Sequence, residues 1–256
     1  PPNSYIVGDS AAGTLDVSNG SLFVPAPNVI FGFGASASGI GSVDGPGSQV
    51  GATGTFELGK FGTGSLDMSN GAALTSFDVF LGTEAGSTGT LNAINNGATI
   101  DVVNRIMVGG AGSGAMTLTG NLTNAPVVSS GSTEVGNGGS GVLSMTGPGT
   151  QWINGSSLVV GQGDGATGTV NMDFQSTFAA GGQIIFGNDT GSGGAAGALN
   201  ISNGASLTGG SGLILGNGAN GAGTLDAANG ASVHAAGAVI VGSSGATGAA
   251  TLSGGA

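Results

Sequence analysis

An apolar pair or triplet followed by glycine recurs ten times along the chain. The glycines that end these segments are Gly8, Gly32, Gly59, Gly82, Gly109, Gly136, Gly161, Gly187, Gly216 and Gly242. They cover nine steps in 234 residues, which gives a mean period of 26 residues. A period of this length is typical of a solenoid, in which each unit buries its apolar side only against its neighbours. The pattern therefore predicts a long stack of similar coils rather than a globular domain with a cleft.

Two further apolar columns appear when the units are aligned on their turns. Asn-Gly pairs mark the turn in segments such as 13–22 and 197–207, because both residues tolerate positive φ, and Pro-Gly takes their place at 45–50 and 147–152. Four residues past the turn the chain is apolar at Phe23, Val50, Leu74, Ile100, Trp152, Phe178, Leu207 and Val233. The segment before the turn contributes Leu15, Val43, Leu66, Leu91, Leu143, Val170, Leu199 and Leu225. Three apolar columns per unit predict three strands per coil.

Stacked coils place equivalent strands side by side in parallel sheets, with neighbouring strands about 4.8 Å apart. The connection between such strands is expected to be right-handed. The chain has neither the six-residue period of a left-handed helix nor the GGxGxDxUx calcium repeat. We therefore predict an all-β fold, a right-handed parallel β-helix of about ten coils of about 26 residues each. The coil between Gly109 and Gly136 fits the repeat worst, so we expect an irregularity there.

The glycine anchors also predict a second apolar face. The residues one and three positions before each anchor are apolar, so the residue between them points to the opposite side of the strand. That middle column is charged only at Glu57 and Glu134, and elsewhere reads Ile6, Ile30, Phe80, Met107, Val159, Ile185, Ile214 and Ile240. Strands that are apolar on both faces are usually covered on both. We expect these eight residues to form a lateral association face; the alternative is a set of exposed aliphatic residues that only strengthens the sheet.

The charge of the chain limits its partners. Two cationic residues, Lys60 and Arg105, stand against thirteen acidic ones, which gives a net charge of −11. Binding to nucleic acid or to an anionic membrane surface needs clustered Lys and Arg, so both partners are excluded. The absence of cysteine excludes disulfides, and no apolar run approaches 18 residues, so we expect no direct membrane insertion by this segment.

Several patterns in the sequence are candidates for sites of chemistry. The aspartates Asp16, Asp44, Asp67 and Asp226 are expected to share one column with Asn92, Asn171 and Asn200. We interpret this column as a solvated outward ladder, with weak cation binding and carboxylate catalysis as lesser alternatives. Sugar-cleaving β-helices combine clustered carboxylates with nearby cations, which this chain lacks.

The remaining motifs also favour structural roles. The single histidine, His234, has no distinctive Ser-His-Asp spacing around it, and segment 160–168 is a glycine-rich turn without the GK[ST] of a phosphate loop. A column of Thr14, Ser65, Thr90, Thr169 and Thr224 leaves ice binding as a minor alternative. Trp152 and Phe178 are expected in the core rather than as platforms for sugars. We assign no catalytic, cofactor-binding or metal-ligating residue and predict that this segment is not an enzyme.

The repeated unit, with its VG anchor, its GTLDVSNG-type core and its GPGTQW variant, resembles a known repeat over nearly the whole chain. It is similar to the repeat of type V autotransporter passengers and of bacterial surface proteins with a PEP-CTERM sorting signal. The resemblance implies secretion and a β-helical stalk on a bacterial surface, with roles in adhesion, aggregation or matrix building. It leaves the export route open, since neither a membrane barrel nor the sorting signal is recognised in these residues.

From the resemblance and the repeat together we expect an extracellular or cell-surface location. The expected partner is another copy of the chain, bound laterally or end to end, or a ligand on a surface or host. A subunit of an extracellular filament or matrix is the alternative, and a polysaccharide-processing β-helix is a lesser one. We expect residues 1–256 to form one solenoid segment of a longer chain or of an end-to-end assembly.

Overall fold

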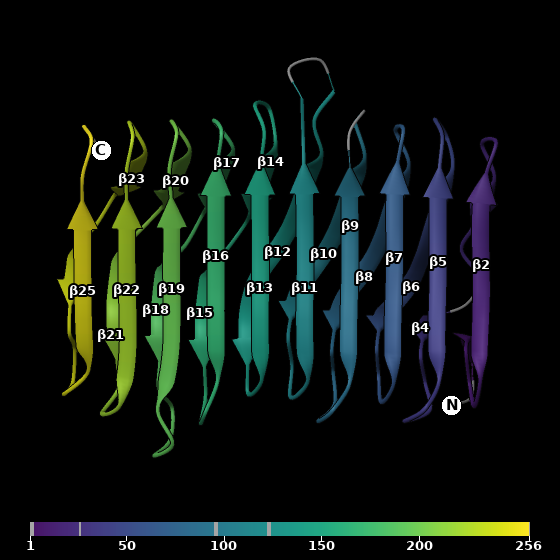
Figure 1. Ribbon diagram of the computed structural model, residues 1–256, viewed down its shortest axis with the longest axis horizontal. Helices are drawn as coiled ribbons and strands as arrows, with labels where there is room; N and C mark the ends of the chain where they lie inside the picture. Colours follow the sequence, from purple (N-terminus) through teal and green to yellow (C-terminus); the bar gives the residue numbers. More distant parts are fainter. Residues whose placement is uncertain (1–2, 26, 95–96, 122–123, 256) are drawn as a thin grey trace.

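The computed structural model describes residues 3–25, 27–94, 97–121 and 124–255 and is a β-solenoid. These residues contain 25 strands and no helix, and the strands pair in parallel throughout. In Figure 1 the strands of one sheet rise in front, the chain returns downward behind them, and each new coil is added on the same side. The coil is therefore right-handed, which confirms the predicted β-helix of about 26 residues per turn.

One sheet holds ten strands in sequence order, one from each coil. They are β2 (Ala12–Ser18), β5 (Ser38–Asp44), β7 (Thr63–Ser69), β9 (Thr88–Ile94), β11 (Ser113–Thr119), β13 (Ser140–Thr146), β16 (Thr167–Asp173), β19 (Ala195–Ile201), β22 (Gly221–Ala227) and β25 (Thr247–Leu252). Their register is continuous from end to end, so each position along the strand forms a column through the stack.

The other sheet has fifteen strands because two of the three strands in each coil belong to it. Four coils fuse these two into one long strand: β6 (Gln49–Leu58), β8 (Ala73–Leu81), β10 (Thr99–Val108) and β12 (Val127–Asn137). Later coils keep them apart as β14 (Gln151–Asn154) and β15 (Leu158–Gln162), β17 (Thr177–Ala180) and β18 (Ile184–Asn188), β20 (Ser206–Gly209) and β21 (Leu213–Asn217), and β23 (Ser232–Ala235) and β24 (Val239–Val241). The first coils contribute β1 (Ser4–Val7), β3 (Leu22–Phe23) and β4 (Asn28–Phe31).

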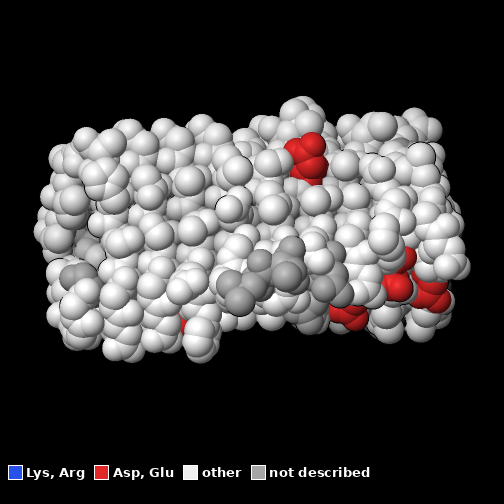
Figure 2. All heavy atoms as spheres, turned by 90° about the horizontal axis from the view of Figure 1, so that it is seen from above, with Lys and Arg blue, Asp and Glu red and all other residues white. Residues whose placement is uncertain are grey.

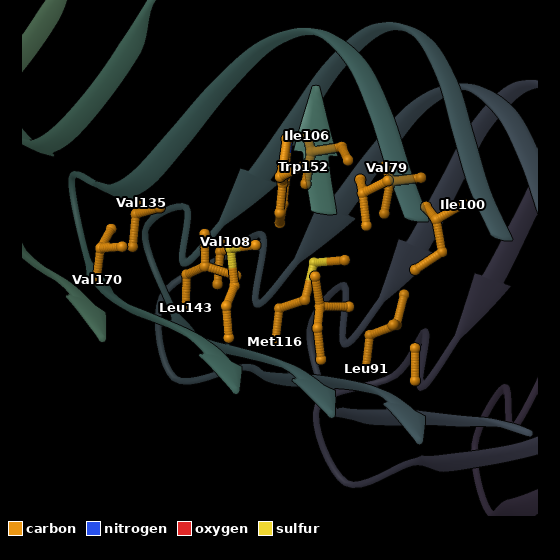
Figure 3. Close-up of a cluster of buried hydrophobic side chains, with 14 of the residues drawn as sticks. Val79, Leu91, Ile100, Ile106, Val108, Met116, Val135, Leu143, Trp152 and Val170 are labelled. Atoms are coloured by element: carbon orange, nitrogen blue, oxygen red, sulfur yellow. The ribbon is translucent and has the colours of Figure 1, made fainter. Parts of the chain in front are cut away.

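The core lies between the two sheets and runs the length of the stack. Figure 3 shows Val79, Ile100, Ile106 and Trp152 of the fifteen-stranded sheet facing side chains of the ten-stranded sheet, Leu91 among them. The column before the anchors is confirmed, since its residues pair in register from Val7 to Val241. The column after the turns is confirmed as well, and Val128 occupies it in the one coil for which no member was predicted.

Two glycine columns make the sharp bend after each anchor possible. All ten anchor glycines have positive φ, between +64° and +79°. The glycine that follows in the ten-stranded sheet packs directly on the anchor: a Cβ on Gly64 would overlap the backbone nitrogen of Gly59. Because the turn between the two glycines holds the differences in length between coils, the strands on either side keep their register.

The opposite bend uses the predicted Asn-Gly turns. Asn19, Asn70, Asn203 and Asn229 have φ between +51° and +57°, and each is followed by a glycine of positive φ. Asn96, the expected turn residue of a fifth coil, lies outside the described residues. The irregularity expected after Gly109 is confirmed, because residues 120–126 separate β11 from β12 where the other coils need only three or four residues.

One part of the predicted alignment was wrong. Val43 pairs with Val17 and Met68, and Gly41 takes its expected place beside Leu15 and Leu66. Asp44, the next residue after Val43, therefore lies two positions away from the aspartate column in which it was expected. The cause is Gly41: the strand position that holds Leu15 and Leu66 in the neighbouring coils has no side chain here, so the apolar pattern pointed to Val43, two residues further along the same face.

Candidate association face

The middle residues of the anchors form one unbroken column on the outside of the fifteen-stranded sheet. We call this column the outer stripe. Its members, paired from coil to coil, are Ile6, Ile30, Glu57, Phe80, Met107, Glu134, Val159, Ile185, Ile214 and Ile240. None of them belongs to the core cluster, whereas the residues on either side of Ile30, Glu57, Phe80, Met107, Val159, Ile185 and Ile214 do. The predicted orientation of this column, away from the core, is therefore observed.

The stripe is less exposed than the sequence predicts. Ile30, Met107 and Ile214 are buried, with at most 8% of each exposed, and only Ile240 in the last coil reaches 39%. Ile6, Phe80, Val159 and Ile185 are half-buried. Two features explain the lower exposure of the stripe. Parallel strands lie only about 4.8 Å apart, so each stripe side chain covers the next one. The turn after the strand also folds back over the stripe, as Gly110 does over the Met107 methyl group.

Both cations of the chain lie beside this stripe, and each forms an ion pair with one of its two glutamates. Lys60 Nζ lies 3.2 Å from Glu57 Oε1, and Arg105 Nη1 lies 3.4 Å from Glu134 Oε2. The Arg105 guanidinium carbon also lies 4.8 Å from the centre of the Phe80 ring, a cation–π contact. The stripe thus carries no net charge on a molecule whose net charge is −11.

Some polar atoms near the middle of the stripe have no partner. Glu57 Oε2, Arg105 Nε and Thr83 Oγ1 are buried without a hydrogen bond to any residue that the structure describes. Buried polar groups are nearly always hydrogen-bonded in folded proteins, so each such group needs an explanation. These atoms are already shielded from solvent, so the charged pairs beside the stripe are packed closely against the sheet.

The aspartate column on the ten-stranded sheet is a ladder of side chains that bond to one another. Asp16 accepts a hydrogen bond from Ser42 at 2.6 Å, Asp67 accepts one from Asn92 at 2.8 Å, and Asn200 donates to Asn171 at 2.9 Å. The column faces outward, as predicted, but without Asp44. In the described part of the chain no three His, Asp or Glu side chains come together as a metal site would require.

Asp44 instead joins the turn of the next coil. Its carboxylate accepts hydrogen bonds from Ser69 Oγ and Asn70 Nδ2, both at 2.6 Å, and these bonds hold the pKa of Asp44 below its ordinary value of 3.8. Asp173 repeats the arrangement with Ser202 and Asn203. These two carboxylates therefore link one coil to the next, and they already accept hydrogen bonds from residues of the protein itself.

The other residues singled out in the sequence lie where structural roles were expected for them. Trp152 stacks on Phe178 in the core, with ring centres 5.4 Å apart, as predicted. Residues 163–166 form the predicted turn between β15 and β16, and His234 is exposed on β23. The threonine column is present, although Ile40, Ala115, Val142 and Ala198 interrupt it. Figure 2 shows one edge of the solenoid, where acidic side chains are scattered and no Lys or Arg is visible.

The sequence did not reveal an apolar groove at the bend of the fifteen-stranded sheet. Val24, Ala52, Phe77 and Val103 line it together with Thr53, Thr75, Ser76 and Asp101, and its volume is about 330 Å³. Phe77 and Val103 are exposed because the strands carry a bulge there, two residues long in β6 and β10 but one in β8. The one available signal was length: Asn70 and Gly82 are one residue closer than the same positions in most coils.

Comparisons of the chain with protein-family models, curated proteins and solved structures found no match. The described residues include no helix that could span a membrane.

Proposed function

We propose that this chain is a non-enzymatic β-solenoid of a bacterial cell-surface or secreted protein, and that it works by lateral self-association through the outer stripe. The observation that supports this most is the charge pattern of the stripe. Eight of its ten residues are apolar, and the only two cations of the chain neutralise the other two. Two copies of an acidic protein repel each other least where they meet on an uncharged surface.

The dimensions of the stripe are compatible with a dimer. Nine steps of about 4.8 Å give a length of about 43 Å. A stable interface buries about 800 Å² on each partner, so a contact about 20 Å wide along the whole stripe would suffice. Because the stripe side chains are half-buried or buried, residues that flank the stripe must also contribute to the contact.

An extracellular filament or matrix subunit is the second candidate. It is favoured by the unbroken register of the ten-stranded sheet, which lets further coils add without a change of geometry. The cell-surface setting and a role in adhesion or aggregation rest on the resemblance of the repeat to autotransporter passengers and PEP-CTERM surface proteins.

Charge placed on the stripe tests the proposal. The double variant Ile185→Lys, Ile240→Lys is expected to weaken self-association at least about tenfold, because each lysine must be desolvated in the interface. Sedimentation velocity measures the effect. The matched control is Ile94→Lys, Ile153→Lys, which places the same two charges on exposed residues of β9 and β14 away from the stripe. Equal self-association of all three proteins, with unchanged circular dichroism, would overturn the proposal.

A further inference from the structure

The Asn-Gly pairs of this chain carry a reaction of their own, the loss of the side-chain amide nitrogen. Glycine favours this reaction because its backbone nitrogen has no side chain beside it. The chain contains nine such pairs, and both residues lie in the described part of the chain for eight of them. The asparagines of these eight pairs are Asn19, Asn70, Asn137, Asn154, Asn203, Asn217, Asn220 and Asn229.

The reaction sets two structural requirements. The backbone nitrogen of the glycine loses its proton and attacks Cγ of the asparagine, so that a bond from this nitrogen to Cγ forms. The bond from Cγ to Nδ2 breaks, and Nδ2 leaves as ammonia. Water then opens the cyclic imide at either of its carbonyl carbons, which gives aspartate or isoaspartate. The fold must therefore let the side-chain amide rotate and must leave the glycine N–H free.

Hydrogen bonds hold the side-chain amide in seven of the eight pairs. Nδ2 is a donor in Asn19, Asn70, Asn137, Asn154, Asn203, Asn217 and Asn220. The shortest of these bonds, at 2.6 Å, go to the carboxylates of Asp44, Glu134 and Asp173. Bonds to charged acceptors are the strongest of their kind. The amide of Asn229 alone donates to no residue that the structure describes.

Asn229 differs from Asn70 and Asn203 in its surroundings and not in its backbone. The φ angles of Asn70, Asn203 and Asn229 are 54°, 51° and 53°, and those of the glycines that follow are 79°, 74° and 75°. All three asparagines are exposed to water. In the coil before Asn229, the position of Asp44 and Asp173 is taken by Ser202, whose hydroxyl donates to Asp173. A carboxylate that could hold the Asn229 amide is therefore missing from this position.

The attacking nitrogen is free at Asn229 as well. In two other turns it is bound: Gly20 N–H donates to Ser48 Oγ at 3.0 Å, and Gly204 N–H donates to the carbonyl of Asn229 at 3.2 Å. Gly230 N–H has no acceptor among the described residues. A Cβ placed on Gly230 would meet no atom within 4 Å. The peptide that joins Asn229 to Gly230 thus has the space to bring this nitrogen to Cγ.

We propose that Asn229 is a site of spontaneous deamidation in the folded protein, and that Asp44 and Asp173 protect Asn70 and Asn203 from the same reaction. Either product adds a negative charge, and isoaspartate also adds a carbon atom to the backbone. Because the Asn229 carbonyl accepts the bond from Gly204, a longer backbone there disturbs the contact between the turns before β20 and β23. The inference concerns a turn and does not depend on the outer stripe.

The test incubates the whole chain at mildly alkaline pH and follows its peptides by mass spectrometry. A protease that cleaves before aspartate releases residues 226–256, in which Asn229 is the only asparagine, and residues 67–77, in which Asn70 is the only one. In the folded protein, 226–256 is expected to convert at least about tenfold faster than 67–77, since a bond to a charged acceptor must first break at Asn70. In concentrated urea the two peptides should convert at similar rates, because the unfolded chain has lost these bonds.

Asp44→Ala tests the protection directly. It removes the acceptor of the Asn70 amide, so conversion of 67–77 is expected to become at least about tenfold faster, while 226–256 keeps its rate. Asp16→Ala is the matched control, because the Asp16 carboxylate is also exposed but accepts its bond from Ser42. It should change neither rate, and circular dichroism checks that both variants are folded. Equal rates for the two peptides in the folded protein, or an unchanged rate at Asn70 in Asp44→Ala, would overturn the inference.

Discussion

The coils with a continuous long strand and the coils with a split strand have the same core but different surfaces. In the continuous half, the bulges of β6, β8 and β10 push Phe77 and Val103 out of the sheet and create a groove. In the split half, small residues form the bend between the two strands. There the outer stripe is purely apolar from Val159 to Ile240. A change of one residue in strand length thus alters the surface of a solenoid while its core stays regular.

The two halves meet at a buried polar cluster. Trp152 Nε1 donates to Ser130 Oγ at 2.9 Å, and Ser130 and Thr133 both contact Asn154 Oδ1. Asn154 in turn donates to the carbonyl of Ser156, in the first break between split strands. These bonds satisfy the backbone and side chains where the continuous strand ends, so the cluster couples one half to the other.

The largest effect is expected from Trp152→Ala. Removing a buried tryptophan costs about 3–5 kcal/mol, and here it also removes the stacking on Phe178 and the bond to Ser130. Stability in a solenoid is carried by contacts between neighbouring coils. Urea unfolding followed by circular dichroism should therefore change from one transition to two, one for each half. A single transition with an unchanged midpoint would show that the cluster does not couple them.

The anchor glycines should be equally sensitive in both halves. Gly161→Ala must adopt a φ near +70° and also overlaps the carbonyl of Ala196, whereas Gly165, with φ near +71°, has no atom within 4 Å of an added Cβ. Gly165→Ala should cost about 1–2 kcal/mol, and Gly161→Ala should cost about 3–5 kcal/mol. Gly59→Ala extends the comparison to the continuous half. Denaturant midpoints measure all three, and equal costs at Gly161 and Gly165 would contradict the packing argument.

The turn at Phe174 and Gln175 is strained and can be improved. Both residues have positive φ, 47° and 60°, in a turn where other coils carry Asn-Gly. Replacing the pair by Asn-Gly is expected to stabilise the protein by about 1–2 kcal/mol. The reverse exchange at Asn203 and Gly204 should destabilise it by a similar amount. Thermal or urea unfolding measures both changes in stability. If the first exchange does not raise the stability, the turn at Phe174 and Gln175 is not strained.

The smallest expected effect is on the stability of the protein at acid pH. The pKa of Asp44 is lowered by the hydrogen bonds from Ser69 and Asn70, so the unfolded chain binds this proton more readily than the folded one. The stability from this group is present above pH 3.8 and is lost as the pH falls through the lower pKa of the folded state. In Asp44→Asn the loss of stability with acid should be shallower than in the unmodified protein. Parallel urea titrations at several acid pH values would detect it, and identical slopes would contradict it.

The sequence was sufficient for the core and insufficient for the surface. The anchor column could be predicted because the same apolar residues recur at a fixed distance before each positive-φ glycine. Asp44 was misplaced because Gly41 leaves its strand position without a side chain, so the apolar pattern follows Val43 instead. The burial of Met107 could not be foreseen, since it depends on contacts between coils, and the exposure of Phe77 depends on a bulge one residue shorter than its neighbours.

The central claim is that the uncharged outer stripe carries lateral association of an acidic solenoid. The most direct measurement is sedimentation velocity of the unmodified protein over a range of protein concentrations, at low and at high NaCl. If apolar contact drives association while net charge opposes it, salt screens the repulsion and the complex becomes stronger as the salt concentration rises. A protein that stays monomeric under all conditions, or a complex that dissociates as salt is added, would contradict the claim.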